Sequence, residues 1–426
     1  MEAKRGLKPP VYVDTDAALS RLIASLRTQP MIAVDTEANP LFAYREKLCL
    51  IQISTRTKDY IVDPLSGIDL SQFVPLFADP NVVKIFHDAE FDILMLKKTL
   101  PVEMLGIYDT KVVATSLGLS AVGLAPILKE FFGVTLDKKY QRSDWGRRPL
   151  TDGQLDYARY DTHFLIPLMA DLREKMSAAD EVNQLEVASE FRRVEQLVPD
   201  VKPFNPDDFV RVKGWDRLDP VNRRTLRELF VMRHELADEF DRPAFKVLPN
   251  DVLLSLARSQ PTTLQSLKKS RVMSEKLRDR HGEAVMAAIS RGQKLSPLPD
   301  DKIHRTKSDQ DRLSDEQRDV YEALRNWRKN VAAKRGVDAS LVLPRPTMFA
   351  LSRLRSRPKT LESLLGCGVL EPWRVSHYGE GIVSALSQPV AHRSRHSKSE
   401  SSSSGMRDRR RNKKRRSGNT RSDDSG

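Results

Sequence analysis

Residues 31–37 have the sequence MIAVDTE, and this stretch decides the fold of the first part of the chain. The apolar run Met31–Val34 is short and bounded by turn residues, which is typical of a strand in a protein core. Successive side chains of a strand point to opposite faces, so Asp35 and Glu37 leave the same face. Two adjacent carboxylates repel each other unless a cation bridges them. The stretch therefore predicts a buried strand that ends in a pair of acids suited to a cation.

An α/β domain is predicted over residues 10–175. The β-rich runs at 48–54 and 59–62 follow the first strand at short separations, as in a meander of neighbouring strands. A fourth strand is expected at 82–86, with a helix after it over 89–98. Strands followed by strands that alternate with helices indicate the α/β class.

A second acidic cluster occupies residues 87–92, which read HDAEFD. Asp88, Glu90 and Asp92 lie within one turn or loop, and each of them could bind a cation. Asp92 falls in the first turns of the expected helix, where the positive end of the helix dipole favours a carboxylate. The spacing alone leaves the choice among the three acids open.

A third cluster lies on a helix that Thr151 and Gln154 open with a capping box, and this helix is expected to run to about Lys175. Tyr157 and Asp161 are four residues apart, so they lie side by side on it. A phenol beside a metal-bound carboxylate can orient or help to deprotonate an attacking water. Carboxylates are the ligands that a pair of hard cations such as Mg²⁺ needs for a phosphodiester displacement. The clusters together predict a metal-dependent nuclease.

The second half of the chain contains an internal repeat. A long amphipathic helix precedes each copy, at about 220–240 and 315–335. Two copies with this long a period indicate duplicated small helical domains, not a solenoid. The shared segments are VLP at 247–249 and 342–344, and P-x-T-L-x-S-L at 261–267 and 358–364.

The composition favours a polyanionic partner, because 71 lysines and arginines exceed 58 acids and give a net charge of +13. Residues 391–426 carry +8 of this charge and almost nothing to bury, so a disordered basic tail is expected. No secretory signal opens the chain. The longest uncharged stretch, 112–128, is too short and too polar to span a bilayer. We expect a soluble intracellular protein with no membrane partner, cytoplasmic, or nuclear if the source is eukaryotic.

Taken together, these motifs resemble the ribonuclease D branch of the DnaQ-like (DEDD) 3′→5′ exonucleases, in the subgroup whose third motif is Tyr-x-x-x-Asp. The resemblance covers about residues 10–175. It rests on VDTE at 34–37, LCLIQIS at 48–54, FHDAEFDI at 86–93, DWGRRPLT at 144–151 and YARYDTH at 157–163.

The resemblance implies a ribonuclease H-like domain, a mixed sheet flanked by helices, that binds two divalent ions, Mg²⁺ or Mn²⁺. It selects Asp92 from the second cluster. The implied activity is a 3′→5′ exoribonuclease that acts on single-stranded RNA 3′ ends, releases 5′-mononucleotides and serves in tRNA or other stable RNA processing. The implied metal ligands are Asp35, Glu37, Asp92 and Asp161, and the implied catalytic tyrosine is Tyr157.

The repeated helical segments resemble HRDC domains, and a tandem pair is the ribonuclease D arrangement. The expected order is exonuclease domain 10–175, linker 176–212, HRDC domain 213–295, linker 296–312, HRDC domain 313–388 and tail 389–426.

The motifs are also similar to those of exosome-associated relatives. The early position of Asp35 leaves no room for their extra N-terminal domain and favours a free-standing ribonuclease D. Ala38 departs from the family, which commonly has an aromatic residue there to hold the terminal base. Two alternatives stay open: a 3′→5′ DNA exonuclease, and a nucleic-acid-binding scaffold with an inactive nuclease fold.

Overall fold

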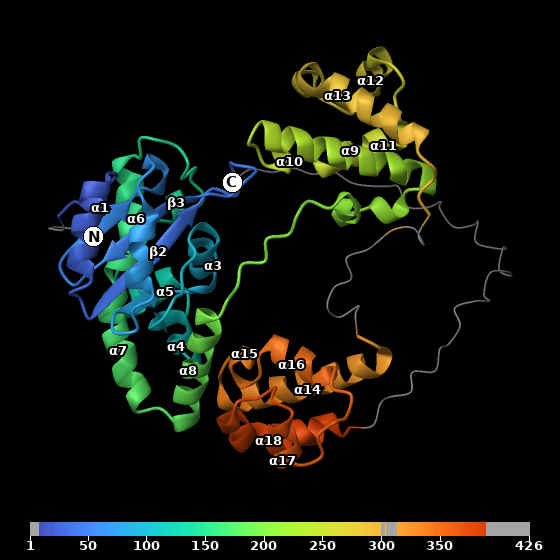
Figure 1. Cartoon of the computed structure of the whole chain (residues 1–426). Helices are drawn as coiled ribbons and strands as arrows, with labels where there is room; N and C mark the ends of the chain where they lie inside the picture. The colour runs from blue at the N-terminus through green and yellow to red at the C-terminus, as the bar shows by residue number, and fades with distance from the viewer. Residues whose placement is uncertain (1–7, 300–302, 304–312, 389–426) are drawn as a thin grey trace, which may run out of the picture. The chain divides into compact units, whose positions relative to one another are not determined.

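A computed structural model describes residues 8–299, 303 and 313–388 (Figure 1). They form one α/β domain and two helical domains, as the sequence predicts. The expected tail at 389–426 and most of the expected linker at 296–312 lie outside the described residues.

The α/β domain is built on a six-stranded mixed sheet with the order β1-β4-β3-β2-β5-β6. The central strands β2, β3 and β4 form the predicted antiparallel meander, whereas β1 pairs with β4, and β5 with both β2 and β6, in parallel. The short outer strands β1 and β6 were not predicted. The strands are β1 Val11–Val13, β2 Met31–Ala38, β3 Leu48–Ser54, β4 Asp59–Val62, β5 Val83–Phe86 and β6 Ile107–Asp109.

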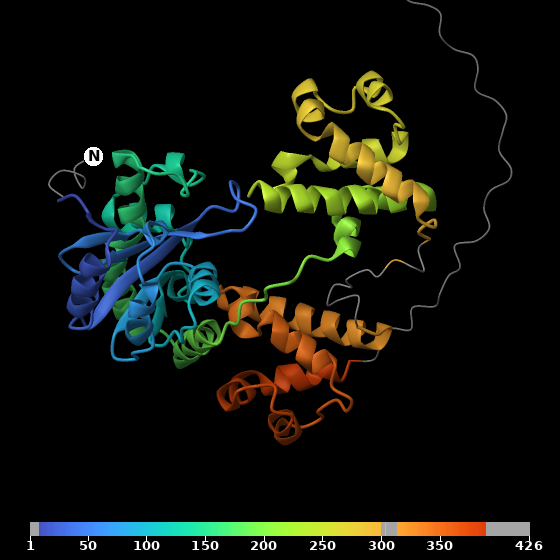
Figure 2. The same cartoon turned by 45° about the horizontal axis from the view of Figure 1, so that its top comes forward.

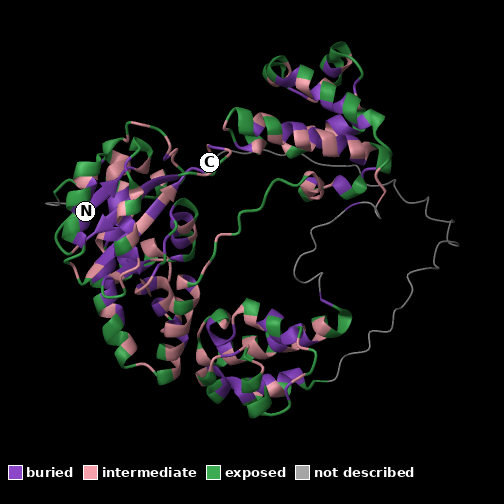
Figure 3. Ribbon diagram, in the orientation of Figure 1, coloured by how far each residue is buried: buried purple, intermediate pink, exposed green. Residues whose placement is uncertain are grey.

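Helices cover both faces of this sheet (Figures 1 and 2). Strand alternation divides the core, because Ile32 and Val34 pack with α1 and α3 while Ala33 packs with α5 and α7. Every residue of β3 is buried, as expected for a strand covered on both sides (Figure 3). The helices are α1 Asp16–Leu26, α2 Val74–Phe77, α3 Glu90–Thr99, α4 Thr110–Ser116, α5 Leu124–Phe132, α6 Asp152–His163, α7 Leu165–Ser177 and α8 Glu181–Glu195.

Two features of this domain differ from the expectation. The helix that Thr151 caps ends at His163, and α7 begins two residues later. Pro167 explains the break, because within a continuous helix its ring would clash with the carbonyl of His163. The stretch expected to be a linker, 176–212, contains α8, whose Phe191 ring lies 5.4 Å from that of Tyr108 in β6.

The two helical domains share the same succession of five helices, so the sequence repeat corresponds to a structural repeat. In each copy a threonine opens the fourth helix with a capping box, Thr263 in the first and Thr360 in the second. The first copy contains α9 Pro220–Glu239, α10 Ala244–Val247, α11 Asn250–Ser259, α12 Leu264–Ser270 and α13 Glu275–Lys294. The second contains α14 Asp315–Arg335, α15 Ala339–Val342, α16 Arg345–Ser352, α17 Leu361–Gly366 and α18 Pro372–Leu386.

Among the described residues, no helix combines the length and the apolar character that crossing a membrane requires.

Close helix packing in the first helical domain gives a testable prediction. A Cβ atom at Gly292 of α13 would lie 2.7 Å from the Cα atom of Thr225 in α9. Gly292→Ala should therefore destabilise this domain by about 1–3 kcal/mol, although alanine is the better helix former. Gly366→Ala is the matched control, because a Cβ there meets nothing within 4 Å. Hydrogen exchange of the α9 and α13 amides measures the effect, and stronger protection in Gly292→Ala would contradict the packing.

Candidate active site

The first two acidic side chains of the site come from β2. The alternation of the strand places Asp35 and Glu37 on the face that Ala33 shares with α5 and α7. Asp35 lies opposite Gln52 of β3, and the pairing shifts register between Glu37 and Ala38. Both carboxylates are half-buried. The sequence prediction of a strand that ends in a pair of acids is therefore confirmed.

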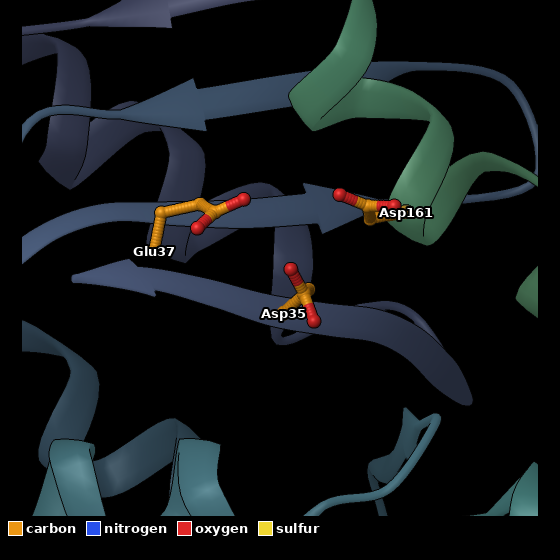
Figure 4. A group of neighbouring side chains, drawn as sticks. All are labelled: Asp35, Glu37 and Asp161. Carbon is orange, nitrogen blue, oxygen red and sulfur yellow. The ribbon is translucent and has the colours of Figure 1, made fainter. Parts of the chain in front are cut away.

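Helix α6 brings the third carboxylate to the same place. The predicted capping box is present, with the Thr151 hydroxyl accepting from the Gln154 amide. Asp161 lies one turn after Tyr157, and a ligand oxygen from each of Asp35, Glu37 and Asp161 lies within 4.8 Å of the others (Figure 4). A cavity of about 630 Å³ is lined by Tyr157 and Asp161 of α6, together with Pro9, Pro10 and Tyr140.

Asp92 of α3 lies next to this group but outside the 4.8 Å cluster. It is buried, and its Oδ1 atom accepts from both the backbone amide of Thr36, at 2.9 Å, and the Thr36 hydroxyl, at 2.5 Å. The rival acids are directed elsewhere: Asp88 pairs with Lys111, and Glu90 pairs with Arg193. Of the three acids that the sequence left open, the structure thus brings Asp92 to the site.

The four carboxylates disfavour one another's charge. Burial raises the pKa of Glu37 to about 10 and that of Asp161 to about 8, and neighbouring carboxylates add to both shifts. Burial and the charge of a neighbouring site carboxylate also raise the pKa values of Asp35 and Asp92 well above their usual range. A largely buried all-carboxylate cluster of this kind suits a divalent cation, since hard cations prefer oxygen ligands and would offset the repulsion.

Tyr157 has its pKa raised by burial and by the charges of Asp161, Glu37 and Asp35. Its hydroxyl is therefore protonated at neutral pH and can donate a hydrogen bond. Its ring lies 5.9 Å from that of Trp145 and 6.3 Å from that of Tyr140.

Sequence reasoning missed two supports of the site. Thr36, between the two acids of β2, points to the opposite face and holds Asp92. Asp109, at the end of β6, accepts from the backbone amides of Asp88 and Ala89 at 3.0 and 2.8 Å, just before α3. The available signal at Asp109 was an aspartate that directly follows an apolar run and precedes a threonine. This pattern is equally typical of an aspartate that caps a helix, so it does not indicate a role at the site.

Comparisons with known proteins agree with this geometry. The 3'-5' exonuclease family matches residues 10–177, and the HRDC domain matches twice, at residues 222–289 and 317–386. The fold and the site thus define a 3'-5' exonuclease domain followed by paired HRDC domains. Gluconacetobacter diazotrophicus ribonuclease D is 30% identical over 304 residues, which cover 69% of this chain and 74% of that protein. The chain belongs to the ribonuclease D family.

A solved structure supports the same fold over most of the chain. Escherichia coli RNase D has a TM-score of 0.62 and 26% identity, covering 89% of this chain and 99% of that one. The exosome complex exonuclease RRP6 of Saccharomyces cerevisiae is 32% identical over 268 residues, which cover 59% of this chain. The matched region is 36% of the yeast protein, so the chain spans about a third of the length of this relative.

The raised pKa values predict how a cation changes stability. Carboxylates with folded pKa values above their unfolded values favour folding at low pH, and this contribution is lost as pH rises from about 4 through the folded values. At pH 8 in EDTA, Asp161→Asn should therefore melt at a higher temperature than the wild type. Mg²⁺ should raise the melting temperature of the wild type more than that of the variant, because the ion binds the folded carboxylates.

Calorimetry in EDTA and in a Mg²⁺ series measures both effects. Asp14→Asn, at an exposed aspartate after β1, is the matched control and should behave like the wild type. Equal Mg²⁺ shifts in all three proteins would mean that the cluster does not bind the ion.

Proposed function

We propose that this protein is a metal-dependent 3′→5′ exoribonuclease, which removes nucleotides one at a time from RNA 3′ ends and releases 5′-mononucleotides. The observation that carries the proposal is the convergence of Asp35 and Glu37 of β2 with Asp161 of α6 to within 4.8 Å, where Tyr157 lies one helical turn before Asp161. Membership of the ribonuclease D family supports the same reaction.

We assign two divalent cations, Mg²⁺ or Mn²⁺, to Asp35, Glu37, Asp92 and Asp161. Such a pair supplies electrostatic stabilisation of the attacking and leaving oxygens of a phosphodiester displacement. Both hydrogen bonds from Thr36 end on Oδ1 of Asp92, which leaves Oδ2 as the oxygen that would be available to a cation. Thr36 thereby orients Asp92, the proposed metal ligand that lies outside the cluster of Asp35, Glu37 and Asp161.

Tyr157 is the catalytic tyrosine of the proposal. Its protonated hydroxyl donates a hydrogen bond to the attacking water and aims the water at the terminal phosphate. Asp161, one turn later on the same helix, keeps the water and the phenol close together. Burial of this part of α6 restricts the positions that the water can take, which lowers the entropy cost of the attack.

The proposed substrate is RNA with a single-stranded 3′ end, in tRNA or other stable RNA processing. The Escherichia coli relative, described as an exoribonuclease involved in structured RNA processing, supports this class. Within the described residues, neither HRDC domain contains a group of metal-ligating side chains, so we assign these domains to substrate binding. We place the activity in the cytoplasm, or in the nucleus of a eukaryotic source.

Digestion of 5′-labelled single strands tests the activity. With Mg²⁺ the wild type should shorten RNA from its 3′ end to a ladder and release 5′-mononucleotides, and EDTA should stop the reaction. Asp35→Asn should abolish hydrolysis yet still bind RNA, because the amide keeps the shape but loses the charge that holds the ion. Asp14→Asn should keep full activity. Faster digestion of DNA would indicate a DNA exonuclease, and binding without digestion of either would indicate a scaffold.

Removal of one hydroxyl tests the role of the tyrosine. Tyr157→Phe should lower the single-turnover rate by about 10²-fold, because a water that is no longer oriented attacks from a poorer geometry. Binding of RNA should change little. Tyr321→Phe, which removes the same group from the buried Tyr321 of α14, is the control and should not affect the rate. An unchanged rate in Tyr157→Phe would reduce the tyrosine to a packing residue.

A further inference from the structure

The segment DWGRRPLT at 144–151 has no part in the proposed mechanism, although it leads directly into α6. Within it, Arg148 forms hydrogen bonds to both Cys49 of β3 and Asp63 after β4. Its side chain is three-quarters buried and reaches the ends of two strands of the sheet. The segment thus returns to the sheet immediately before the catalytic helix begins.

All five N–H donors of Arg148 find acceptors, which is the full capacity of a guanidinium group. Nε and Nη2 donate to the two carboxylate oxygens of Asp63, each at 2.6 Å. Nη2 also donates to the carbonyl of Cys49, and Nη1 donates to the carbonyls of Trp145 and Arg147. One side chain therefore connects its own loop with β3 and with the end of β4.

Asp63 is itself held on several sides. Only 6% of its side chain is exposed, and it accepts from the Tyr12 hydroxyl at 2.5 Å and from the Leu65 amide at 3.0 Å. The pKa of Asp63 lies below its usual range because the bonds from Arg148 and Tyr12 outweigh the effect of burial. The carboxylate is therefore ionised and presents a fixed partner to the guanidinium.

The bond from Arg148 to the Trp145 carbonyl links the Arg148–Asp63 pair to the residue whose ring packs beside Tyr157. That ring is 1% exposed and packs in a cluster with Cys49, Leu50, Ile61 and Ala158. The Tyr157 ring packs against this cluster, with its centroid 5.9 Å from that of Trp145. One backbone carbonyl and one aromatic contact thus connect Arg148 with the catalytic tyrosine.

We propose that Arg148, anchored by Asp63, is a positioning residue that sets the orientation of the Tyr157 hydroxyl through Trp145. This inference rests on the proposed exonuclease function. The planar fork of arginine suits the task, because lysine keeps the charge but cannot make the bidentate bond and the three carbonyl bonds together. Among the described residues, none of the four site carboxylates bonds to Arg148 or Asp63. Cation binding should therefore not depend on the Arg148–Asp63 ion pair.

The test is a double-mutant cycle on the single-turnover rate. Arg148→Lys should lower the rate by about 10–100-fold, as expected when a catalytic group is misplaced by a fraction of its working distance. The Mg²⁺ concentration for half-maximal activity should not change. In the Tyr157→Phe background, Arg148→Lys should have less than about a threefold effect, because the hydroxyl that it positions is absent. Arg147→Lys, at the exposed neighbour, is the matched control.

Equal factors in the two backgrounds would overturn the proposal, since they would mean that Arg148 supports the domain as a whole. Trp145→Phe is the second variant in case Arg148→Lys does not fold. It should also lower the single-turnover rate by about 10–100-fold when Tyr157 is present, and have less than about a threefold effect in the Tyr157→Phe background. An unchanged rate in this variant would also overturn the proposal.

A second measurement does not depend on activity. In protein labelled with 3-fluorotyrosine, the ¹⁹F resonance of Tyr157, assigned with Tyr157→Phe, should move in Arg148→Lys and stay in Arg147→Lys. An unmoved resonance would overturn the positioning role even if the wild type did not hydrolyse RNA. An inactive wild type with a moved resonance would contradict the proposed function alone.

Discussion

The two-residue period of β2 is the constraint on which the rest of the site depends. It sends Asp35 and Glu37 to one face of the sheet, where α6 brings Asp161. It sends Thr36 to the other face, where α3 brings Asp92. Three consecutive residues therefore contact the helices on both faces of the sheet. A slip of one residue in the β2–β3 register would turn each of these side chains to the opposite face. The full burial of β3 pins that register, because a slip would place the pair of acids in the apolar core.

Local spacing explains how much of this could be predicted from the sequence. Asp35 with Glu37, and Tyr157 with Asp161, are pairs within one element, and strand or helix periodicity places each pair without tertiary information. Asp92 is different, because the turn that contains Asp88 and Glu90 offers three acids of equal standing. In the structure, Asp88 and Glu90 form ion pairs with Lys111 and Arg193, which lie further along the chain, and Asp92 is left to the site. Periodicity carries no information about such partners.

The elements that the sequence analysis did not predict also depend on partners elsewhere in the chain. Strands β1 and β6 have only three residues each, too few to show a pattern, and they exist because longer neighbours offer them hydrogen bonds. Helix α8 lacks a strong apolar stripe and is stabilised by contact with β6 and α4, so its sequence resembled a linker. The repeated domains were easier to predict, because the same apolar and capping residues occur twice at nearly equal spacing.

The site draws its carboxylates from three elements that are separated widely along the chain, β2, α3 and α6. During synthesis the N-terminal strands leave the ribosome first, and α6 follows more than a hundred residues after β2. A nascent chain that ends before Asp161 holds at most three of the four acids. In the proposed mechanism, the order of the motifs therefore leaves the set of carboxylates incomplete in an unfinished polypeptide until α6 has been made.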